Sequence, residues 1–88
     1  MSDTHLQEEA VGLITHYYSH LGVAAVKLTA PLKVGDRIHV RGHTTDLVQP
    51  VGSMEVDHRS VEAADPGDDV ALKVDEHVRE HDQIWIEE

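Results

Sequence analysis

The stretch Leu32-Lys33-Val34-Gly35-Asp36-Arg37-Ile38-His39-Val40-Arg41 indicates most clearly which kind of fold the chain adopts. It contains a turn signal, Gly35-Asp36, because glycine can take a positive φ and an aspartate side chain can bond nearby amides. After the turn, the apolar residues Ile38 and Val40 alternate with charged or polar residues. A period of two predicts a β-strand whose apolar side chains face a core and whose other side chains face outward.

The same turn chemistry recurs twice in the second half of the chain. Gly67-Asp68 precedes an alternating run, 69–74, and His81-Asp82 precedes a short closing run, 83–86. Each unit is expected to be a turn that starts a strand. The unequal spacing of the three units indicates recurring turn chemistry and not a solenoid repeat.

Further strands are predicted at 10–18, 23–29 and 45–58, the last interrupted at Pro50 and Gly52. Only residues 75–81 leave room for a helical turn. The sequence therefore predicts an all-β domain over residues 10–88, a small closed or partly closed β-barrel of six to seven strands, because closure removes exposed sheet edges. Residues 1–9 are expected to form a flexible acidic tail.

Composition and charge narrow the class of protein. The 88 residues include 17 acidic and 7 basic side chains, a net charge of -10, and no cysteine. These counts exclude disulfide scaffolds, thiolate metal sites and cysteine nucleophiles, and they argue against general attraction to nucleic acid or anionic lipid. The longest apolar stretch, 21–26, is far shorter than the ~20 residues of a membrane span, and the first residues do not form a secretory signal. A cytoplasmic monomer without membrane contact is expected.

The order of these segments resembles the β-barrel second domain of translational GTPases such as elongation factor Tu, through residues 11–12, 32–38, 51–56 and 63–72. The whole chain is more similar to free-standing translation elongation factor-like proteins. The segments that carry this closer resemblance are His16-Tyr17-Tyr18, Gly42-His43-Thr44-Thr45-Asp46 and Val78-Arg79-Glu80-His81-Asp82. A similar barrel stands at the C-terminus of U32-type peptidase-like proteins, some of which act in RNA modification. The last turn departs from the GTPase pattern, because His81 stands where those proteins usually have glycine.

Positive charge is concentrated in one segment. Residues 24–43 carry four basic side chains against Asp36 alone, whereas both flanking segments are acidic. The candidate contact patch consists of Lys33, Arg37, His39, Arg41 and His43. One interpretation is a solvated strand face paired with acids across the sheet. The other is a contact surface for RNA phosphate or an acidic protein, and the resemblance favours it because the GTPase barrel contacts ribosomal RNA and the aminoacyl end of tRNA.

The residues required for catalysis, nucleotide binding or a metal centre are not found in the sequence. No glycine precedes a lysine, so the chain contains no phosphate-binding loop, and neither GTPase activity nor nucleotide binding is expected. No serine lies in a nucleophile elbow. Among the histidine pairs spaced by four, only His77 and His81 could approach one ion, and two nitrogens fall short of the three or four ligands of zinc. The chain is therefore expected to be no enzyme, with no cofactor and no metal.

The predicted function is a non-catalytic binding or adaptor module that contacts RNA or a protein partner in translation or RNA processing. Two alternatives remain open from the sequence. The first is an accessory subunit that docks on a U32-type peptidase-like RNA-modification enzyme. The second is a structural acidic protein that binds no nucleic acid.

The acidic, lysine-poor composition also predicts a halophilic protein, and this leads to a test. Uncompensated negative charges repel one another in the compact state, and salt screens that repulsion. The thermal midpoint, followed by circular dichroism, should rise as potassium chloride increases from low to molar concentration. A midpoint that stays constant or falls would contradict the halophilic interpretation.

Overall fold

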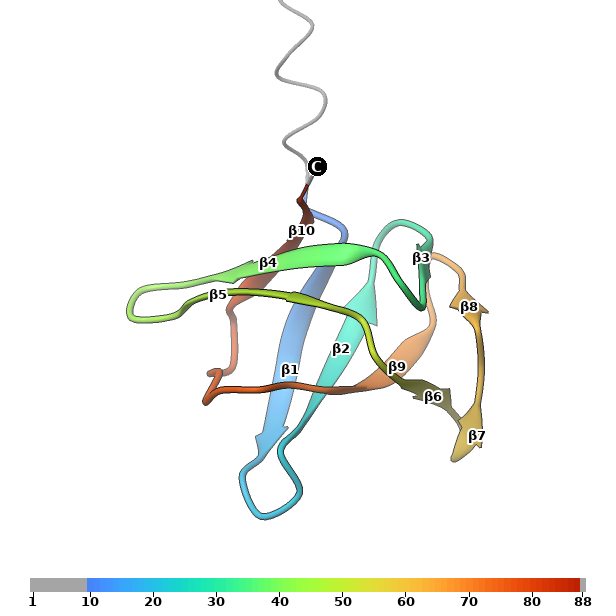
Figure 1. Ribbon diagram of the computed structural model, residues 1–88, viewed down its shortest axis with the longest axis horizontal. Coiled ribbons are helices and arrows are strands. Elements are labelled where there is room, and N and C mark those ends of the chain that lie inside the picture. The colour runs from blue at the N-terminus through green and yellow to red at the C-terminus, as the bar shows by residue number, and fades with distance from the viewer. Residues whose placement is uncertain (1–9, 88) are drawn as a thin grey trace, which may run out of the picture.

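The computed structural model describes residues 10–87, which form ten β-strands and no helix (Figure 1). The predicted tail, 1–9, lies outside the described residues. The strands are β1 (Gly12–Tyr18), β2 (Val23–Leu28), β3 (Leu32–Lys33), β4 (Arg37–Arg41), β5 (Asp46–Pro50), β6 (Met54–Val56), β7 (Arg59–Ser60), β8 (Ala63–Ala64), β9 (Asp69–Lys73) and β10 (Gln83–Ile86). The prediction of an all-β domain is confirmed, because residues 10–87 contain strands and no helix. The helical turn allowed for residues 75–81 is wrong, because that segment contains a bend at 75–76, irregular backbone at 77–79 and a turn at 80–81. Residues 10–87 contain no helix that could span a membrane.

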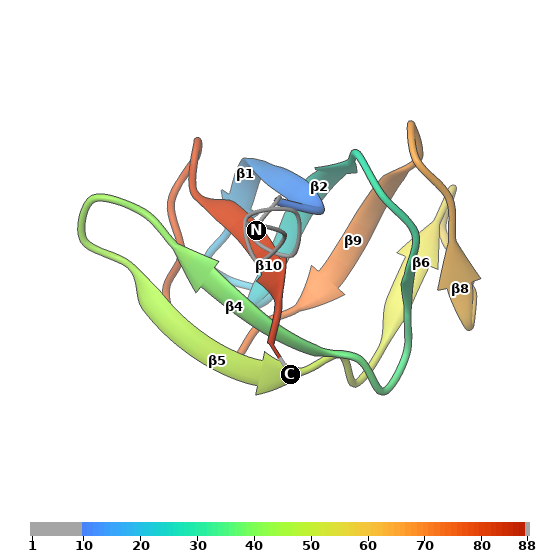
Figure 2. The same ribbon diagram turned by 90° about the horizontal axis from the view of Figure 1, so that it is seen from above.

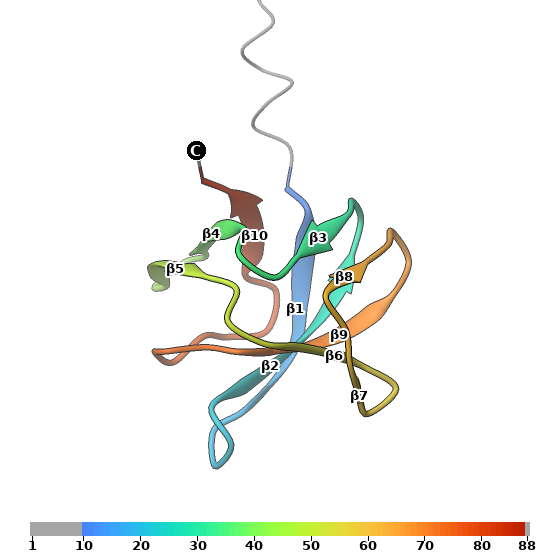
Figure 3. The same cartoon turned by 45° about the vertical axis from the view of Figure 1, so that its right-hand side comes forward.

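Eight strands form a single antiparallel sheet in the order β5-β4-β10-β1-β2-β9-β6-β7, and β3 pairs with β8 in a separate two-stranded sheet (Figure 3). The large sheet curls strongly around the core but stays open, as the view from above shows (Figure 2). The prediction was a closed or partly closed barrel of six to seven strands. The closed form and the number of strands are wrong, because eight strands form an open, strongly curled half-barrel. The physical reason lies at Pro50, which ends β5 because proline has no amide proton for a further ladder bond. The predicted long strand, 45–58, is split there into β5 and β6.

The core lies inside the curl and is built from the alternating apolar residues. Ile38 and Val40 of β4 are fully buried between exposed or half-buried neighbours, so the alternation predicted for this strand is confirmed. The other strands contribute in the same way. The buried apolar residues are Val11, Ile14, Ala24, Val26, Leu28, Leu32, Ile38, Val40, Leu47, Val51, Met54, Ala64, Val70, Leu72, Val74, Val78 and Ile84.

The three predicted turns share one hydrogen-bonding arrangement. The carboxylate oxygen Oδ2 of Asp36 accepts a bond from the amide of Lys33 at 3.0 Å, and that of Asp68 accepts one from Asp65 at 2.9 Å. In the third turn, Oδ2 of Asp82 accepts from the amide of Arg79 at 2.9 Å. In all three, the aspartate amide also donates back to the carbonyl three residues earlier. Each aspartate therefore closes its turn from both sides, and β4, β9 and β10 begin directly after it.

The residue that precedes each turn aspartate has a positive φ, which accounts for glycine at two of the three positions. Gly35 has φ 97° and Gly67 has φ 92°, which glycine adopts without steric cost. His81 takes the corresponding position with φ 76°. The departure from glycine therefore leaves the turn geometry intact, and the backbone strain falls on a histidine. A left-handed conformation costs a residue with a Cβ about 1–2 kcal/mol.

The third turn is also packed against the hairpin between β4 and β5. Asp82 is buried, with 4% of its surface exposed. A Cβ added at Gly42 would collide with its Oδ1 atom. Gly42 is therefore required by the close approach of the Asp82 carboxylate, which fixes the start of β10 beneath the end of β4.

The side chain of Gln49 bridges the open side of the sheet. Its Nε2 donates to the carbonyl of Lys73 at 3.0 Å, and its Oε1 accepts from the amide of Asp75 at 2.8 Å. Gln49 lies on the edge strand β5, whereas its two partners lie at and just after the end of β9. The buried amide thus replaces the strand pairing that a closed barrel would have at this place.

Replacement of Gln49 by leucine tests this bridge. Gln49→Leu preserves side-chain size but leaves the Lys73 carbonyl and the Asp75 amide without their partner, which costs about 1–3 kcal/mol for each buried group left unsatisfied. Urea denaturation should therefore show a loss of at least about 1 kcal/mol in the free energy of unfolding. Gln83→Leu is the matched control, because Gln83 is exposed on β10 and should change stability by less than about 0.5 kcal/mol. Equal stability of the two variants would show that the bridge contributes nothing.

Candidate functional site

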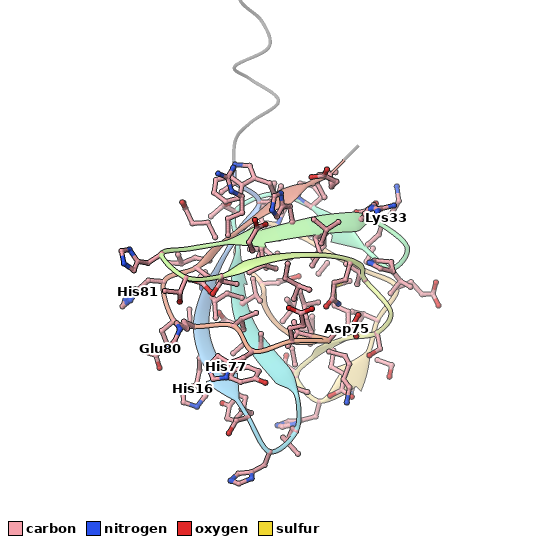
Figure 4. All side chains as sticks on the ribbon, turned by 60° about the vertical axis from the view of Figure 1, so that its left-hand side comes forward. His16, Lys33, Asp75, His77, Glu80 and His81 are labelled. Atoms are coloured by element: carbon pink, nitrogen blue, oxygen red, sulfur yellow. The ribbon has the colours of Figure 1, made fainter. Side chains whose placement is uncertain are left out.

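The structure places the five candidate residues on three adjoining segments. Arg37, His39 and Arg41 share the outward face of β4, as the alternation predicts. Lys33 lies before the Gly35-Asp36 turn, on β3 of the small sheet, and is exposed (Figure 4). His43 is exposed in the loop between β4 and β5. Only the three β4 residues therefore form one continuous surface, with Lys33 and His43 beyond its two ends.

His39, in the middle of this surface, is held between two acids. Its Nε2 lies 2.5 Å from Oδ1 of Asp46 on β5, and its Nδ1 lies 3.4 Å from Oε1 of Glu87. Its side chain is 23% exposed. For His39, the interpretation of a strand face paired with acids across the sheet therefore applies. The two contacts join β4 to β5 and to the residue that follows β10.

The two arginines behave differently from His39. No ion pair joins the guanidinium group of Arg37 or Arg41 to another residue of the described range, 10–87. The Arg41 guanidinium lies instead over the Trp85 ring, with its central carbon 5.6 Å from the ring centroid. A cation over an aromatic face is held in place while its outer side stays available to an acidic group.

Trp85 joins the site through strand pairing that the sequence does not reveal. The sequence leaves two interpretations of this side chain, an exposed contact or packing over the end of a barrel, and favours the second. The structure places Trp85 opposite His39, which in turn lies opposite Val48 on β5. Trp85 is half-buried and Val48 is 39% exposed. We call this outward surface of Arg37, His39, Arg41, Val48 and Trp85 the β4 face.

One signal in the sequence pointed to the outward direction of Trp85. It stands between Ile84 and Ile86, and Ile84 is fully buried, so alternation turns the indole away from the core. The alternation of residues along β10 does not reveal which strand pairs with it. Because β10 pairs with β4, from the middle of the chain, the contact between Arg41 and Trp85 depends on the sheet order alone.

His77 and His81, the histidine pair considered from the sequence as metal ligands, make other contacts in the structure, and so does His16. The His77 ring packs against Tyr17 with 4.7 Å between centroids, and His16 contacts Glu80 at 3.2 Å (Figure 4). His81 lies in the positive-φ turn. Across residues 10–87, no group of three or more histidine, aspartate or glutamate side chains is arranged to hold a metal ion.

No protein-family model matches the chain. Curated proteins with similar sequences carry the names of proteolytic enzymes. The chain is 36% identical over 77 residues to an uncharacterized protease of Methanocaldococcus jannaschii, which is 86% of this chain and 19% of that protein. It is 33% identical over 81 residues to a collagenase of Porphyromonas gingivalis, which is 90% of this chain and 22% of the collagenase. The chain thus spans about a fifth of the length of the curated relatives it matches.

A solved structure matches the entire chain. The C-terminal domain of a putative U32 peptidase from Geobacillus thermoleovorans superposes with a TM-score of 0.87, covering 100% of this chain and 99% of that domain at 21% identity. The chain has the fold of that domain. The selenomethionine variant of the same domain gives a TM-score of 0.83 over 89% of the chain. These similarities support the U32-type resemblance and give no support to a free-standing elongation factor-like protein.

The contact between Arg41 and Trp85 can be tested by fluorescence, because Trp85 is the one tryptophan of the chain. Arg41→Gln removes the cation that covers the indole, so the emission maximum should move to longer wavelength as water reaches the ring. The free energy of unfolding should fall by about 0.5–1 kcal/mol, the usual contribution of an exposed cation–π pair. Arg37→Gln is the control and should change neither quantity. Identical spectra for both variants would contradict the contact.

Proposed function

We propose that the chain is a non-catalytic accessory domain that docks on a U32-type peptidase-like enzyme. The observation that carries the proposal is the match of the whole fold to the C-terminal domain of a putative U32 peptidase. The curated relatives add weight, because a region equivalent to this chain forms about a fifth of each of two proteins named as proteolytic enzymes. The proposal is the same whether this domain and the catalytic part of the enzyme belong to one polypeptide chain or to two.

The arrangement of hydrogen bonds supports a role without catalysis. A nucleophilic hydroxyl needs a base within hydrogen-bonding distance. In residues 10–87, His16 is hydrogen-bonded to the carboxylate of Glu80, and His39 to that of Asp46. Neither of these bonds involves a serine or threonine hydroxyl. These two contacts join β1 to the turn before β10 and β4 to β5, which supports a structural role for both histidines.

The β4 face is the surface that we assign to docking, with Lys33 and His43 at its ends. Tryptophan and arginine are the residues that contribute most to protein interfaces, and they are most effective beside apolar groups that exclude water. The β4 face combines Trp85, Arg41 and Val48 in this way, and Arg37 adds a second guanidinium. Planar guanidinium groups bind carboxylates in a bidentate manner, so the partner surface should carry aspartate or glutamate.

Contact with RNA in translation or RNA processing, the main function predicted from the sequence, stays a prediction. The same two arginines could contact phosphate, and Trp85 could stack on a base. The net charge of -10 opposes diffuse attraction to a polyanion, so any RNA contact would have to be short-range. An acidic protein surface of limited size meets this restriction more easily than a nucleic acid does.

The test is a charge reversal on β4. Arg37→Glu/Arg41→Glu should weaken binding to the catalytic part of a U32-type peptidase-like enzyme, prepared without its own C-terminal domain, by at least about tenfold. Loss of two charge-assisted contacts, each of about 1.5–3 kcal/mol, is sufficient for that change. Titration calorimetry measures the affinity. Lys27→Glu/Arg59→Glu, on β2 and β7, changes the net charge equally away from the β4 face and should leave binding intact.

Two results would contradict the proposal. If both double variants bind the enzyme as the unmodified protein does, the docking surface does not include Arg37 and Arg41. If the unmodified protein binds RNA but not the enzyme, and the β4 variant loses the RNA, the β4 face belongs to an RNA-binding module.

A further inference from the structure

A second surface, separate from the β4 face, is a groove on the outside of the sheet. It has a volume of about 830 Å³ and lies over β2, β9 and β6. The β1–β2 and β6–β7 hairpins border it, and both extend away from the end of the molecule at which β10 finishes (Figures 1 and 3). We call it the alanine groove because outward-facing alanines form its floor.

The floor is made by one row of paired residues. Ala25 on β2 lies opposite Ala71 on β9, and Ala71 lies opposite Glu55 on β6. Two small side chains in adjacent strands leave space where larger residues would otherwise fill the outer surface. Ala25 and Ala71 are half-buried, so the space is open to solvent and apolar at its base.

Exposed apolar residues form one wall of the alanine groove. Tyr18 is 46% exposed and Leu21 is 62% exposed, both at the end of the β1–β2 hairpin. The large apolar residues that are exposed in residues 10–87 are Leu13, Tyr18, Leu21 and Val48, so two of the four line this groove. Exposed apolar groups gathered at a concave site are typical of a surface that another molecule covers.

The opposite wall is acidic. Glu55 and Asp57, from β6 and the turn after it, make no ion pair with any other residue in the described part of the chain. Of the lysines nearby, Lys27 pairs with Asp69 at 3.6 Å, whereas Lys73, which lines the groove, donates from Nζ to the neutral Leu21 carbonyl at 3.3 Å and keeps its positive charge. The lining holds the carboxylates of Glu55, Asp57 and Asp69 against the single ammonium of Lys73, so the groove carries net negative charge beside an apolar floor.

We infer that the alanine groove binds an extended peptide segment of a partner protein, in which large apolar residues alternate with lysine or arginine. Along an extended segment, alternate side chains point to opposite sides. Apolar side chains can thus enter the space above Ala25 and Ala71. The cationic side chains between them can bend their long aliphatic stems toward Glu55 and Asp57. This charge requirement is opposite to that of the acidic partner proposed for the β4 face, so the two surfaces take different partners.

Nuclear magnetic resonance titration with two capped hexapeptides tests the inference. The first alternates leucine and lysine, and the second alternates leucine and glutamine. The leucine–lysine peptide should shift the amide signals of Ala25, Glu55 and Ala71 in a saturable manner, and the leucine–glutamine peptide should bind more weakly. Shifts spread evenly over the acidic surface would overturn the proposal, because they would indicate attraction to net charge alone.

Variants of the groove make the assignment specific. Ala71→Arg fills the floor and should abolish the shifts. Glu55→Gln/Asp57→Asn removes both charges and should weaken binding about three- to tenfold, as expected for two exposed ion pairs. Asparagine tolerates the positive φ of 53° at position 57. The matched control, Glu62→Gln/Glu76→Gln, removes two exposed charges elsewhere and should bind as the unmodified protein does.

Two further outcomes would overturn the proposal. Equal affinity of the groove variant and its control would show that Glu55 and Asp57 do not select the peptide. Sedimentation measurements could reveal a dimer that Ala71→Arg dissociates, and the groove would then bind a second copy of this chain. Because these readouts do not involve the β4 face, failure here would leave the proposed docking function standing, and the reverse also holds.

Discussion

The rest of the structure depends on one interaction, the hydrogen bond that an aspartate carboxylate accepts from the backbone amide three residues before it. It closes the turns before β4, β9 and β10. Strands β4 and β10 supply most of the β4 face, and β9 supplies part of the floor of the alanine groove. A turn closed from both sides fixes where the next strand begins, and the alternation of side chains then fixes which residues face outward. A one-residue shift at Asp36 would place Arg37 and Arg41 in the core. The tolerance of a positive φ at His81 shows that the aspartate bonds keep the third turn even where glycine is absent.

The open sheet has consequences for function. A closed barrel of this size would satisfy its edges internally, whereas this sheet ends at β5 and β7 and uses the side chain of Gln49 to bridge the opening. The β5 edge remains at the surface next to β4, and Val48 extends the β4 face toward it. At the other end of the sheet, the short β6–β7 hairpin projects and forms one wall of the alanine groove. Both proposed surfaces thus depend on the sheet staying open.

The two proposed surfaces differ in charge and therefore in the kind of partner that each could bind. The β4 face has guanidinium groups and an indole, and it suits an acidic partner. The alanine groove has unpaired carboxylates and exposed apolar groups, and it suits a cationic peptide. The chain has a net charge of -10, and its cationic side chains on β4 are concentrated on one face of that strand. A domain with two such surfaces could hold an enzyme part with one and a further protein segment with the other.

The sequence by itself determined the all-β class, the three turns, the inward direction of Ile38 and Val40 and the outward direction of Arg37, His39 and Arg41. These features are local, because turn residues and alternation act over a few neighbouring positions. Only the tertiary structure decided that the sheet stays open, that Trp85 lies beneath Arg41, that Asp46 and Glu87 bracket His39, and that Ala25 meets Ala71 to form a groove. Apart from the contact between His39 and Asp46 within one hairpin, these contacts join segments distant in the chain. Strand alternation gives the direction of a side chain but not the strand that lies beside it.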